Sequence, residues 1–414
     1  MLEDLPIIIP IVAIVLAIMD IPGIKLLRES AVIFSLGSGI IYLSIPALVL
    51  YLLVENRFHP IYRGRTAGLV SGVLIVAGIL GLTALSPITD RTYSELAQLF
   101  LYILLYFLFT SALRDGQDIM RFLRASVCGS MAVCVLAYTA VLLGWQGAPD
   151  VYVGRGANEG SIFVTLLGTI PACVMLARTR NPFYAIAIIL FFYIPYLATS
   201  RGGLVVSAVS VLTTAFFFTR SFILRSAMVV SGVVLAIRNT PIFLNVFEGQ
   251  INFSARERIA LIEYGLDLMR DRFWTGWGWG STNRLAEAAP NTRLNYPHFH
   301  NTYIQLMVEL GVFGCILIFF IVVFLGYYIY KALYIYKGNP AASVLIIATS
   351  LGIILSGVSD AMIFGADRFI QLVFLFGLIV RTTAVWQEQN GMMPLVARSE
   401  GQFDGRSHPG ALGS

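Results

Sequence analysis

Residues 302–330 read TYIQLMVELGVFGCILIFFIVVFLGYYIY and contain a single charged side chain. A helix of roughly 20 apolar residues crosses the hydrocarbon core of a bilayer, which is about 30 Å thick. Runs of comparable length and polarity recur along most of the chain. The expected fold class is therefore all-α, a polytopic transmembrane helical bundle.

Composition supports this expectation and limits the classes of function. Of the 414 residues, 57% are hydrophobic and 12% are charged, whereas soluble domains have roughly 45–50% apolar and about 25% charged residues. The net charge of +5 is attributed to the anchoring of cytoplasmic loops, so nucleic acid is not an expected partner. The acidic start, MLED, favours a retained first helix over a cleavable signal peptide. The cysteines lack metal or disulfide spacing and are interpreted as small apolar residues, at Cys128, Cys134, Cys173 and Cys315.

The chain is expected to cross the membrane about twelve times. The predicted spans are residues 5–20, 31–54, 66–85, 96–112, 125–143, 161–177, 183–199, 203–219, 226–240, 302–330, 343–360 and 368–381. Lysine and arginine are concentrated in alternate connections, which lie in the cytoplasm by the positive-inside rule. These connections carry Arg57, Arg63, Arg65, Arg114, Arg121, Arg124, Arg178, Arg180, Arg220, Arg225, Lys331, Lys337 and Arg381. Both termini are then cytoplasmic, and the predicted location is the bacterial inner membrane.

This topology divides the chain into four regions. Residues 1–238 are predicted to form eight or nine transmembrane helices, and residues 301–386 about three more. Residues 239–300 are predicted to form a periplasmic catalytic loop with an amphipathic helix. Residues 387–414 are polar and rich in glycine, and we expect them to be a disordered cytoplasmic tail.

The predicted amphipathic helix begins with two arginines. Ser254 and Glu257 have the spacing of a capping box, which places Arg256 and Arg258 in the first turn. A cation there is unfavourable for the helix itself, so these arginines indicate an anionic partner, unless they pair with Glu257 or Glu263 or contact lipid phosphates. Apolar residues then recur at helical spacing, at Ile259, Ile262, Leu266, Met269 and Phe273. The opposite face carries Arg258, Glu263, Asp267, Arg270 and Asp271.

Two histidines close the loop, and either could accept a proton from a hydroxyl nucleophile. We favour His300 over His298, because His300 directly precedes the next span and should lie at the membrane surface. A metal site would need carboxylate ligands, since no further histidine or cysteine is predicted on this side, and no metal or other cofactor is expected. Trp277 belongs to WTGWGWG, residues 274–280. Its tryptophans are interpreted as membrane anchors or as a platform for sugar or lipid.

Further ionisable residues are predicted on the periplasmic side of the membrane. Arg201 lies in TSRGG, residues 199–203, at a tight turn between two spans. An ionisable group at that position is costly unless it is paired or functional. Arg155, Glu159 and Arg368 are weaker candidates, because an ordinary solvated loop explains them.

In chain order, three of these elements resemble the O-antigen ligase and polymerase superfamily of bacterial membrane glycosyltransferases. The first is SRG at 200–202, and the second is S-x-R followed by an amphipathic helix and a G-x-G turn, within 254–280. The third is HNTYIQLMVELG at 300–311, which is close to the family pattern H-N-x-Y-x-Q-x-x-x-E-x-G. The motif-bearing stretch covers roughly residues 150–330. The chain departs from the family at Ala255, where glycine is usual.

The resemblance implies a metal-independent, inverting glycosyltransferase whose donor is a glycan on undecaprenyl pyrophosphate. Arg201 and Arg256 would hold the pyrophosphate, and His300 would be the general base on the acceptor hydroxyl. The predicted substrate contacts are Arg258, His298, Asn301, Arg155 and Trp277. The implied partners are the lipid-linked glycan, an acceptor glycolipid or glycan, the lipid bilayer and other membrane proteins of polysaccharide assembly.

Several functions stay open at this point. The enzyme is either a ligase with lipid A-core as acceptor, or a polymerase of O-antigen or exopolysaccharide repeat units with the same donor. The short connection at 144–160 favours the ligase. A transporter or flippase of lipid-linked glycan would instead need ionisable residues deep inside its spans. A structural subunit would not need grouped arginines and histidines.

Overall fold

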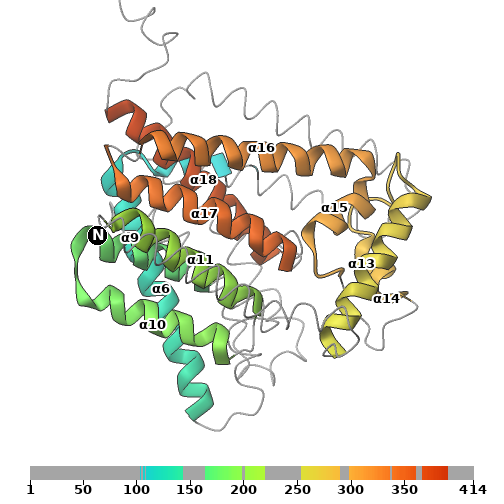
Figure 1. Ribbon diagram of the computed structural model, residues 1–414, viewed down its shortest axis with the longest axis horizontal. Coiled ribbons are helices and arrows are strands. Elements are labelled where there is room, and N and C mark those ends of the chain that lie inside the picture. Colours follow the sequence, from blue (N-terminus) through green and yellow to red (C-terminus); the bar gives the residue numbers. More distant parts are fainter. Residues whose placement is uncertain are drawn as a thin grey trace, which may run out of the picture.

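The computed structural model of the chain describes residues 103, 106–107, 109–142, 164–197, 201–219, 253–289, 298–335, 338–359 and 366–389. All of the elements in these residues are helical (Figure 1), which confirms the all-α prediction. The predicted spans at 5–20, 31–54, 66–85 and 226–240, the tail from residue 390, and both Arg155 and Glu159 lie outside the described residues. The number of spans and the four-region division therefore stay predictions.

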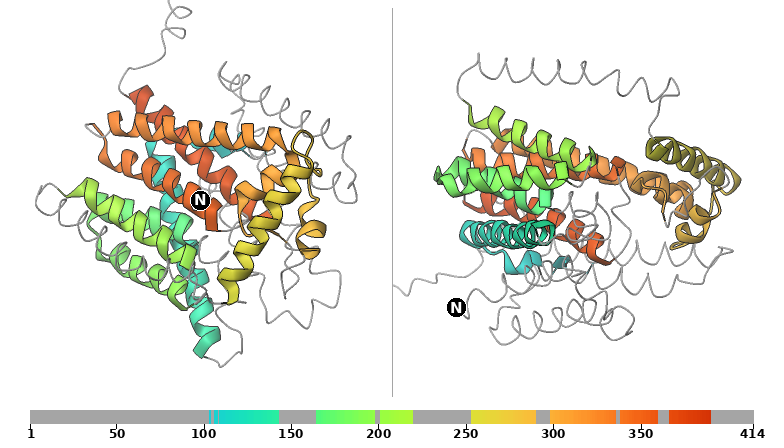
Figure 2. Two further views of the ribbon diagram at one scale, coloured as in Figure 1. Left: turned by 45° about the vertical axis from the view of Figure 1, so that its right-hand side comes forward. Right: turned by 90° about the horizontal axis from the view of Figure 1, so that it is seen from below.

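The described helices form a bundle with a smaller group of helices at one end (Figures 1 and 2). The bundle consists of α6 (Gly116–Leu142), the π-helix η3 (Val164–Thr169), α9 (Ile170–Thr179), α10 (Pro182–Leu197), α11 (Arg201–Phe218), α16 (Val312–Ile335), α17 (Pro340–Ser359) and α18 (Ala366–Gln389). The smaller group consists of α13 (Phe253–Asp271), α14 (Thr282–Glu287) and α15 (Thr302–Leu310).

The helix α17 lies at the centre of the bundle, where it packs against α9, α11, α16 and α18. Its small residues allow close approach, since a Cβ on Gly352 would lie 2.5 Å from a methyl carbon of Leu166 and 3.5 Å from one of Val206. The core beside it is aromatic, and the ring of Phe109 packs edge-on against the rings of Phe122 and Phe374.

The two helices α16 and α17 are long and apolar enough to cross a membrane. Only 11% of the most apolar 18-residue stretch of α16 is buried, against 72% of the corresponding stretch of α17. Large apolar side chains therefore cover the outer surface of α16, including Phe319 and Phe320, which are each more than 60% exposed. Such a surface fits contact with lipid, because soluble monomers rarely expose a large contiguous apolar patch.

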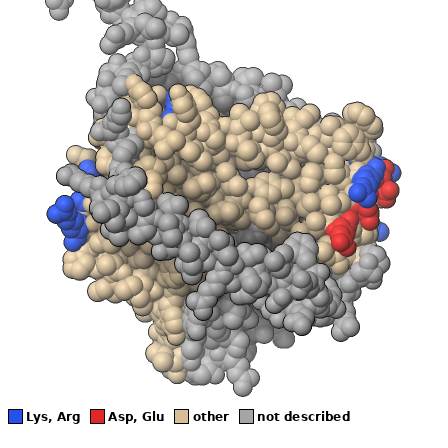
Figure 3. Space-filling model, viewed as in Figure 1, with Lys and Arg blue, Asp and Glu red and all other residues tan. Residues whose placement is uncertain are grey.

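The end of the bundle away from α13 is rich in arginine. Arg381, near the end of α18, donates to the backbone carbonyls of Leu113 and Arg114. The buried carboxylate of Asp118, in the first turn of α6, pairs with Arg114 and Arg121 at 3.1 and 3.4 Å. Figure 3 shows lysine and arginine at this end and a mixture of charges on the far side, where α13 lies in Figure 1. These basic residues are among those that the sequence assigns to cytoplasmic connections.

Three predicted boundaries need correction. The stretch 302–330 is not one helix, because the chain turns at Gly311 between α15 and α16. The helix α6 begins at Gly116, well before residue 125, because polar residues of its first turns are held by the ion pairs of Asp118. The helix α18 continues to Gln389, well past residue 381, since Arg381 pairs with Glu388 further along the same helix at 2.9 Å.

Candidate active site

Residues 253–289 and 298–311, which we call the end unit, have a hydrophobic core of their own. Its buried side chains are Leu261, Leu268, Leu285, Ala286, Ala289, Phe299, Ile304 and Val308. The helices α13 and α15 approach closely, because a Cβ on Gly265 would lie 2.5 Å from a methyl carbon of Ile304. The fully buried ring of Phe299 packs against the same glycine. The end unit is thus a packed support for the histidines on either side of Phe299.

The helix α13 differs from the prediction in its start and in its buried face. It begins at Phe253, so Ser254 lies inside the helix rather than at the N-cap, and Arg258 lies beyond the first turn. Its buried face consists of Glu257, Leu261, Gly265 and Leu268, because α15 packs there. The predicted apolar face is half-buried, apart from Phe273, which is 38% exposed. Acidic and basic residues are exposed as predicted, at Glu263, Asp267, Arg270 and Asp271.

The tryptophan- and glycine-rich turn after α13 caps the end of α15. The backbone amides of Trp277 and Gly278 donate to the carbonyls of Val308 and Glu309, both at 2.9 Å. Gly276 and Gly311 have φ values of 67° and 58°, a region that disfavours side chains. A Cβ on Gly276 would also lie 2.3 Å from the carbonyl oxygen of Glu309. These glycines serve close backbone packing and helix termination.

The tryptophans of this turn have different environments. The indole N–H of Trp277 donates to the carbonyl of Leu268 at 2.8 Å, and the Arg272 guanidinium lies 4.9 Å from the centre of its ring. These contacts hold Trp277 within the end unit, and its role as a substrate contact stays a prediction. Trp274 is 73% exposed and packs edge-on against Phe273, as suits a membrane anchor.

Asn301 joins the end unit to the bundle. Its side-chain oxygen accepts from the amides of Tyr303 and Ile304 at 3.0 and 3.1 Å, which caps α15. Its side-chain nitrogen donates to the carbonyl of Val358, near the end of α17, at 3.3 Å. The hydroxyl of Tyr303 donates to the carbonyl of Ile354 at 3.0 Å. The start of α15 is therefore fixed to one end of α17.

His300 directly precedes this anchored cap. Its backbone has a φ of 50°, which non-glycine residues adopt only when their surroundings enforce it. The His298 and His300 rings lie side by side, with centroids 4.1 Å apart, while Phe299 points into the core of the end unit. His298 is 6% exposed and His300 is half-buried, so His300 is the more accessible imidazole.

Tyr264 is another titratable group in the end unit. Burial, with a smaller contribution from the Asp271 carboxylate, raises the pKa of Tyr264 above its usual value. The phenol therefore stays protonated at neutral pH and cannot serve as the base. Histidine is the residue type whose ordinary pKa lies nearest to neutral pH, so His300 stays the predicted base.

A buried carboxylate in α15 was not anticipated from the sequence. Glu309 is 2% exposed, and it accepts hydrogen bonds from the Thr282 hydroxyl, the Thr282 amide and the Gln305 side chain. This network ties α14 to α15. The signal in the sequence is the charge of Glu309 itself, because a carboxylate within an apolar run requires partners.

The positions of the predicted arginines follow from the helices that contain them. Arg201 begins α11, which runs antiparallel to α17 with Val206 beside Gly352. Continuing both helices by about six residues brings Arg201 level with Val358, the residue that Asn301 contacts. Arg256 lies near the start of α13, and Arg258 is half-buried in the following turn. The side chains of Arg201, Arg256 and Arg368 lie outside the described residues, as does all of Arg155.

Residues 163–319 match the O-antigen ligase family. This match confirms the resemblance to the O-antigen ligase and polymerase superfamily, and it covers α11, the end unit and the start of α16. Members of the family are membrane proteins, in agreement with the exposed apolar surface of α16. No curated protein matches the chain.

Proposed function

We propose that this protein transfers a glycan from undecaprenyl pyrophosphate to an acceptor hydroxyl at the periplasmic face of the inner membrane. The observation that carries the proposal is the attachment of His300 to the end of the bundle where α11 begins. Asn301 makes this attachment through Val358, and Arg201 is the first residue of α11. His300, the proposed proton acceptor, and Arg201, the proposed phosphate-binding residue, would then lie at one end of the molecule.

In the proposed reaction, His300 accepts the proton of the acceptor hydroxyl. The acceptor oxygen attacks the anomeric carbon of the donor sugar from the face opposite the pyrophosphate. A glycosidic C–O bond forms while the bond from the anomeric carbon to the phosphate oxygen breaks, and the configuration inverts. Undecaprenyl pyrophosphate leaves with the bonding electron pair.

Arginines would stabilise the charge that develops on this leaving group, because preorganised cations lower the energy of such a transition state. Arg201 and Arg256 are the proposed catalytic pair. Arg258, Arg155, His298 and Trp277 are the proposed further contacts with the substrate. Because the bond from the sugar to the phosphate is already activated, the proposed reaction requires no nucleotide, and the proposed catalysis uses arginines in place of a metal ion.

Lipid A-core is the proposed acceptor, which makes the protein a ligase. A repeat-unit polymerase uses the same donor and the same chemistry, and the two are separated by the glycan that accumulates in cells without the gene. Gel analysis of surface polysaccharide should reveal long chains stranded on the lipid carrier if a ligase has been lost. Single capped repeats in place of long chains would contradict the ligase assignment and identify a polymerase.

The role of His300 is tested by transfer with purified, reconstituted protein and lipid-linked glycan. General base catalysis contributes roughly 10²- to 10⁴-fold to a rate, so His300→Gln should lower kcat by that factor while the protein remains folded. His298→Gln is the comparison variant: as a proposed substrate contact it should mainly raise KM, and it should lower kcat much less than His300→Gln because His298 is the more buried imidazole. Near-normal transfer by His300→Gln would refute the proposed base.

A further inference from the structure

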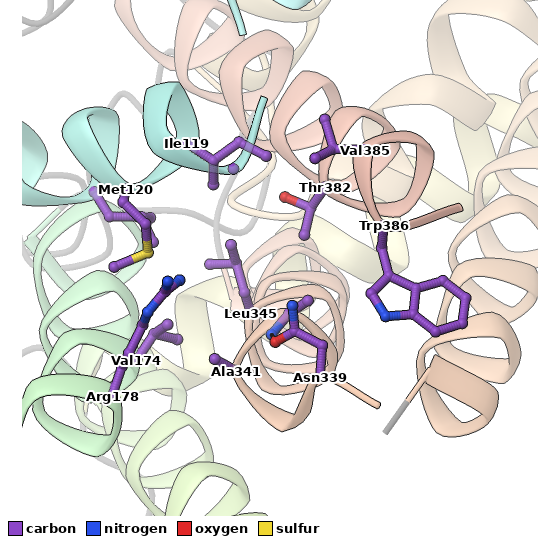
Figure 4. Close-up of a pocket in the computed structure, with 13 residues that line it drawn as sticks. Ile119, Met120, Val174, Arg178, Asn339, Ala341, Leu345, Thr382, Val385 and Trp386 are labelled. Atoms are coloured by element: carbon purple, nitrogen blue, oxygen red, sulfur yellow. Dashed lines mark hydrogen bonds between the residues drawn. The ribbon is translucent and has the colours of Figure 1, made fainter. Parts of the chain in front are cut away.

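The arginine-rich end of the bundle contains a cavity that the proposed transfer does not use. It lies between the starts of α6 and α17 and the ends of α9 and α18 (Figure 4). Its volume is about 50 Å³. Since one buried water needs roughly 10–15 Å³ of such space, the cavity has room for a group of several non-hydrogen atoms.

A buried hydroxyl points into this cavity without a hydrogen-bond partner. Thr382, in α18, is 4% exposed, and its hydroxyl has no partner among the described residues. Figure 4 shows this hydroxyl directed into the space between the helices. The adjacent Thr383 shows the usual alternative, since its hydroxyl donates to the carbonyl of Ile379 at 2.9 Å. A buried polar group is normally satisfied, so a polar group of a ligand, or a water molecule, in the cavity would satisfy Thr382.

The other polar groups of the lining are hydrogen-bond donors. The Arg178 guanidinium, at the end of α9, lies at the exposed mouth and forms no ion pair within the described part of the chain. The Asn339 oxygen caps α17 by accepting from the Ala342 amide at 3.1 Å, which leaves its nitrogen as a donor. The positive end of the α17 dipole faces the same space. None of the described residues that line the cavity is a carboxylate, so this lining favours an anion.

The deeper walls of the cavity are apolar. They are formed by Ile119, Met120, Leu123, Val174, Leu345 and Val385. A cavity of about 50 Å³ holds a headgroup phosphate but not hydrocarbon chains, which would remain in the surrounding bilayer. Trp386 also lines the cavity, and tryptophan is enriched at membrane interfaces. Basic pockets between transmembrane helices are known sites for anionic lipid headgroups.

We propose that this cavity binds the phosphate of an anionic phospholipid headgroup at the arginine-rich end of the bundle. The Arg178 guanidinium, the Thr382 hydroxyl and the Asn339 amide nitrogen donate to the phosphate oxygens. The lipid tails extend away from the cavity into the bilayer. The site lies at the opposite end of α17 from Asn301 and is independent of the proposed transfer.

The test measures thermal unfolding of the full-length protein in neutral detergent with added phosphatidylglycerol, phosphatidylcholine or inorganic phosphate. Phosphatidylglycerol should raise the Tm of the wild type more than either other addition. Arg178→Gln and Thr382→Val should each raise the phosphatidylglycerol concentration needed for a half-maximal shift by at least roughly tenfold, as expected for the loss of one hydrogen bond to an anion.

Matched variants distinguish the loss of lipid binding at this site from general effects of removing a charge or a buried hydroxyl. Arg180→Gln removes a neighbouring charge that does not line the cavity, and Thr383→Val removes a neighbouring buried hydroxyl. Both should respond like the wild type, as should Thr382→Ser, which keeps the hydroxyl. Equal losses in the control variants, or no response of the wild type to phosphatidylglycerol, would overturn the site. An equal shift with inorganic phosphate alone would overturn its assignment to a lipid.

Discussion

Asn301 uses one side chain for two contacts, since its oxygen caps α15 and its nitrogen holds Val358 of α17. Asn301→Ala should lower the free energy of unfolding by about 1–2 kcal/mol, the usual cost of losing a cap. It should also lower kcat, because His300 loses its anchor to the bundle. The two effects are read from thermal unfolding and from the kinetics of glycan transfer.

Asn339→Ala is the matched control at the residue scale, because it removes the equivalent cap of α17 at the other end of the bundle. Its transfer activity should stay near that of the wild type despite a similar loss of stability. If both variants lowered kcat equally, the effect of Asn301 would be one of stability alone.

The sequence motif at 300–311 identifies candidate site residues, but it does not reveal which residues they contact. His300 and Asn301 were predicted as site residues from the motif. The partner of Tyr303 is Ile354, and that of Glu309 is Thr282. Such contacts join residues far apart in the chain, and spacing within one segment does not specify them.

At the scale of helices, the turn between α15 and α16 depends on Gly311. A Cβ there would lie 2.4 Å from the carbonyl oxygen of Phe273, and the φ of 58° is unfavourable for alanine. Gly311→Ala should therefore destabilise the protein by at least about 1–3 kcal/mol. Thermal unfolding and the level of folded protein after membrane extraction measure this effect.

Gly326, within α16, provides the control, because no other part of the described chain lies within 4 Å of the position that its Cβ would take. Gly326→Ala should keep or slightly raise the stability, since alanine is the better helix former by about 1 kcal/mol. A Gly311→Ala variant as stable as Gly326→Ala would contradict the packing described for this turn.

Hydropathy predicted the helical class, and it predicted the bounds of α10 and α11 closely, because a long apolar run is enough to indicate a helix. It did not predict the break at Gly311, where the apolar run continues on both sides. It also missed the buried face of α13, since Leu261, Gly265 and Leu268 are recognised only once α15 packs against them. Both features depend on tertiary contacts.

At the scale of the whole molecule, the end unit and the arginine-rich end lie at opposite ends of the bundle. The positive-inside rule then predicts that the end unit is periplasmic. The central claim of the proposed function depends on this sidedness, because the lipid-linked donor is presented on the outer leaflet. Two exposed positions allow a test, Glu263 in the end unit and Gln117 at the start of α6.

The most direct measurement uses a membrane-impermeant maleimide on intact spheroplasts, with single cysteines introduced into a background without the four native ones. Glu263→Cys should be labelled in intact cells, whereas Gln117→Cys should be labelled only after the membrane is permeabilised. The reverse pattern would place His300 in the cytoplasm and contradict the proposed donor and reaction together.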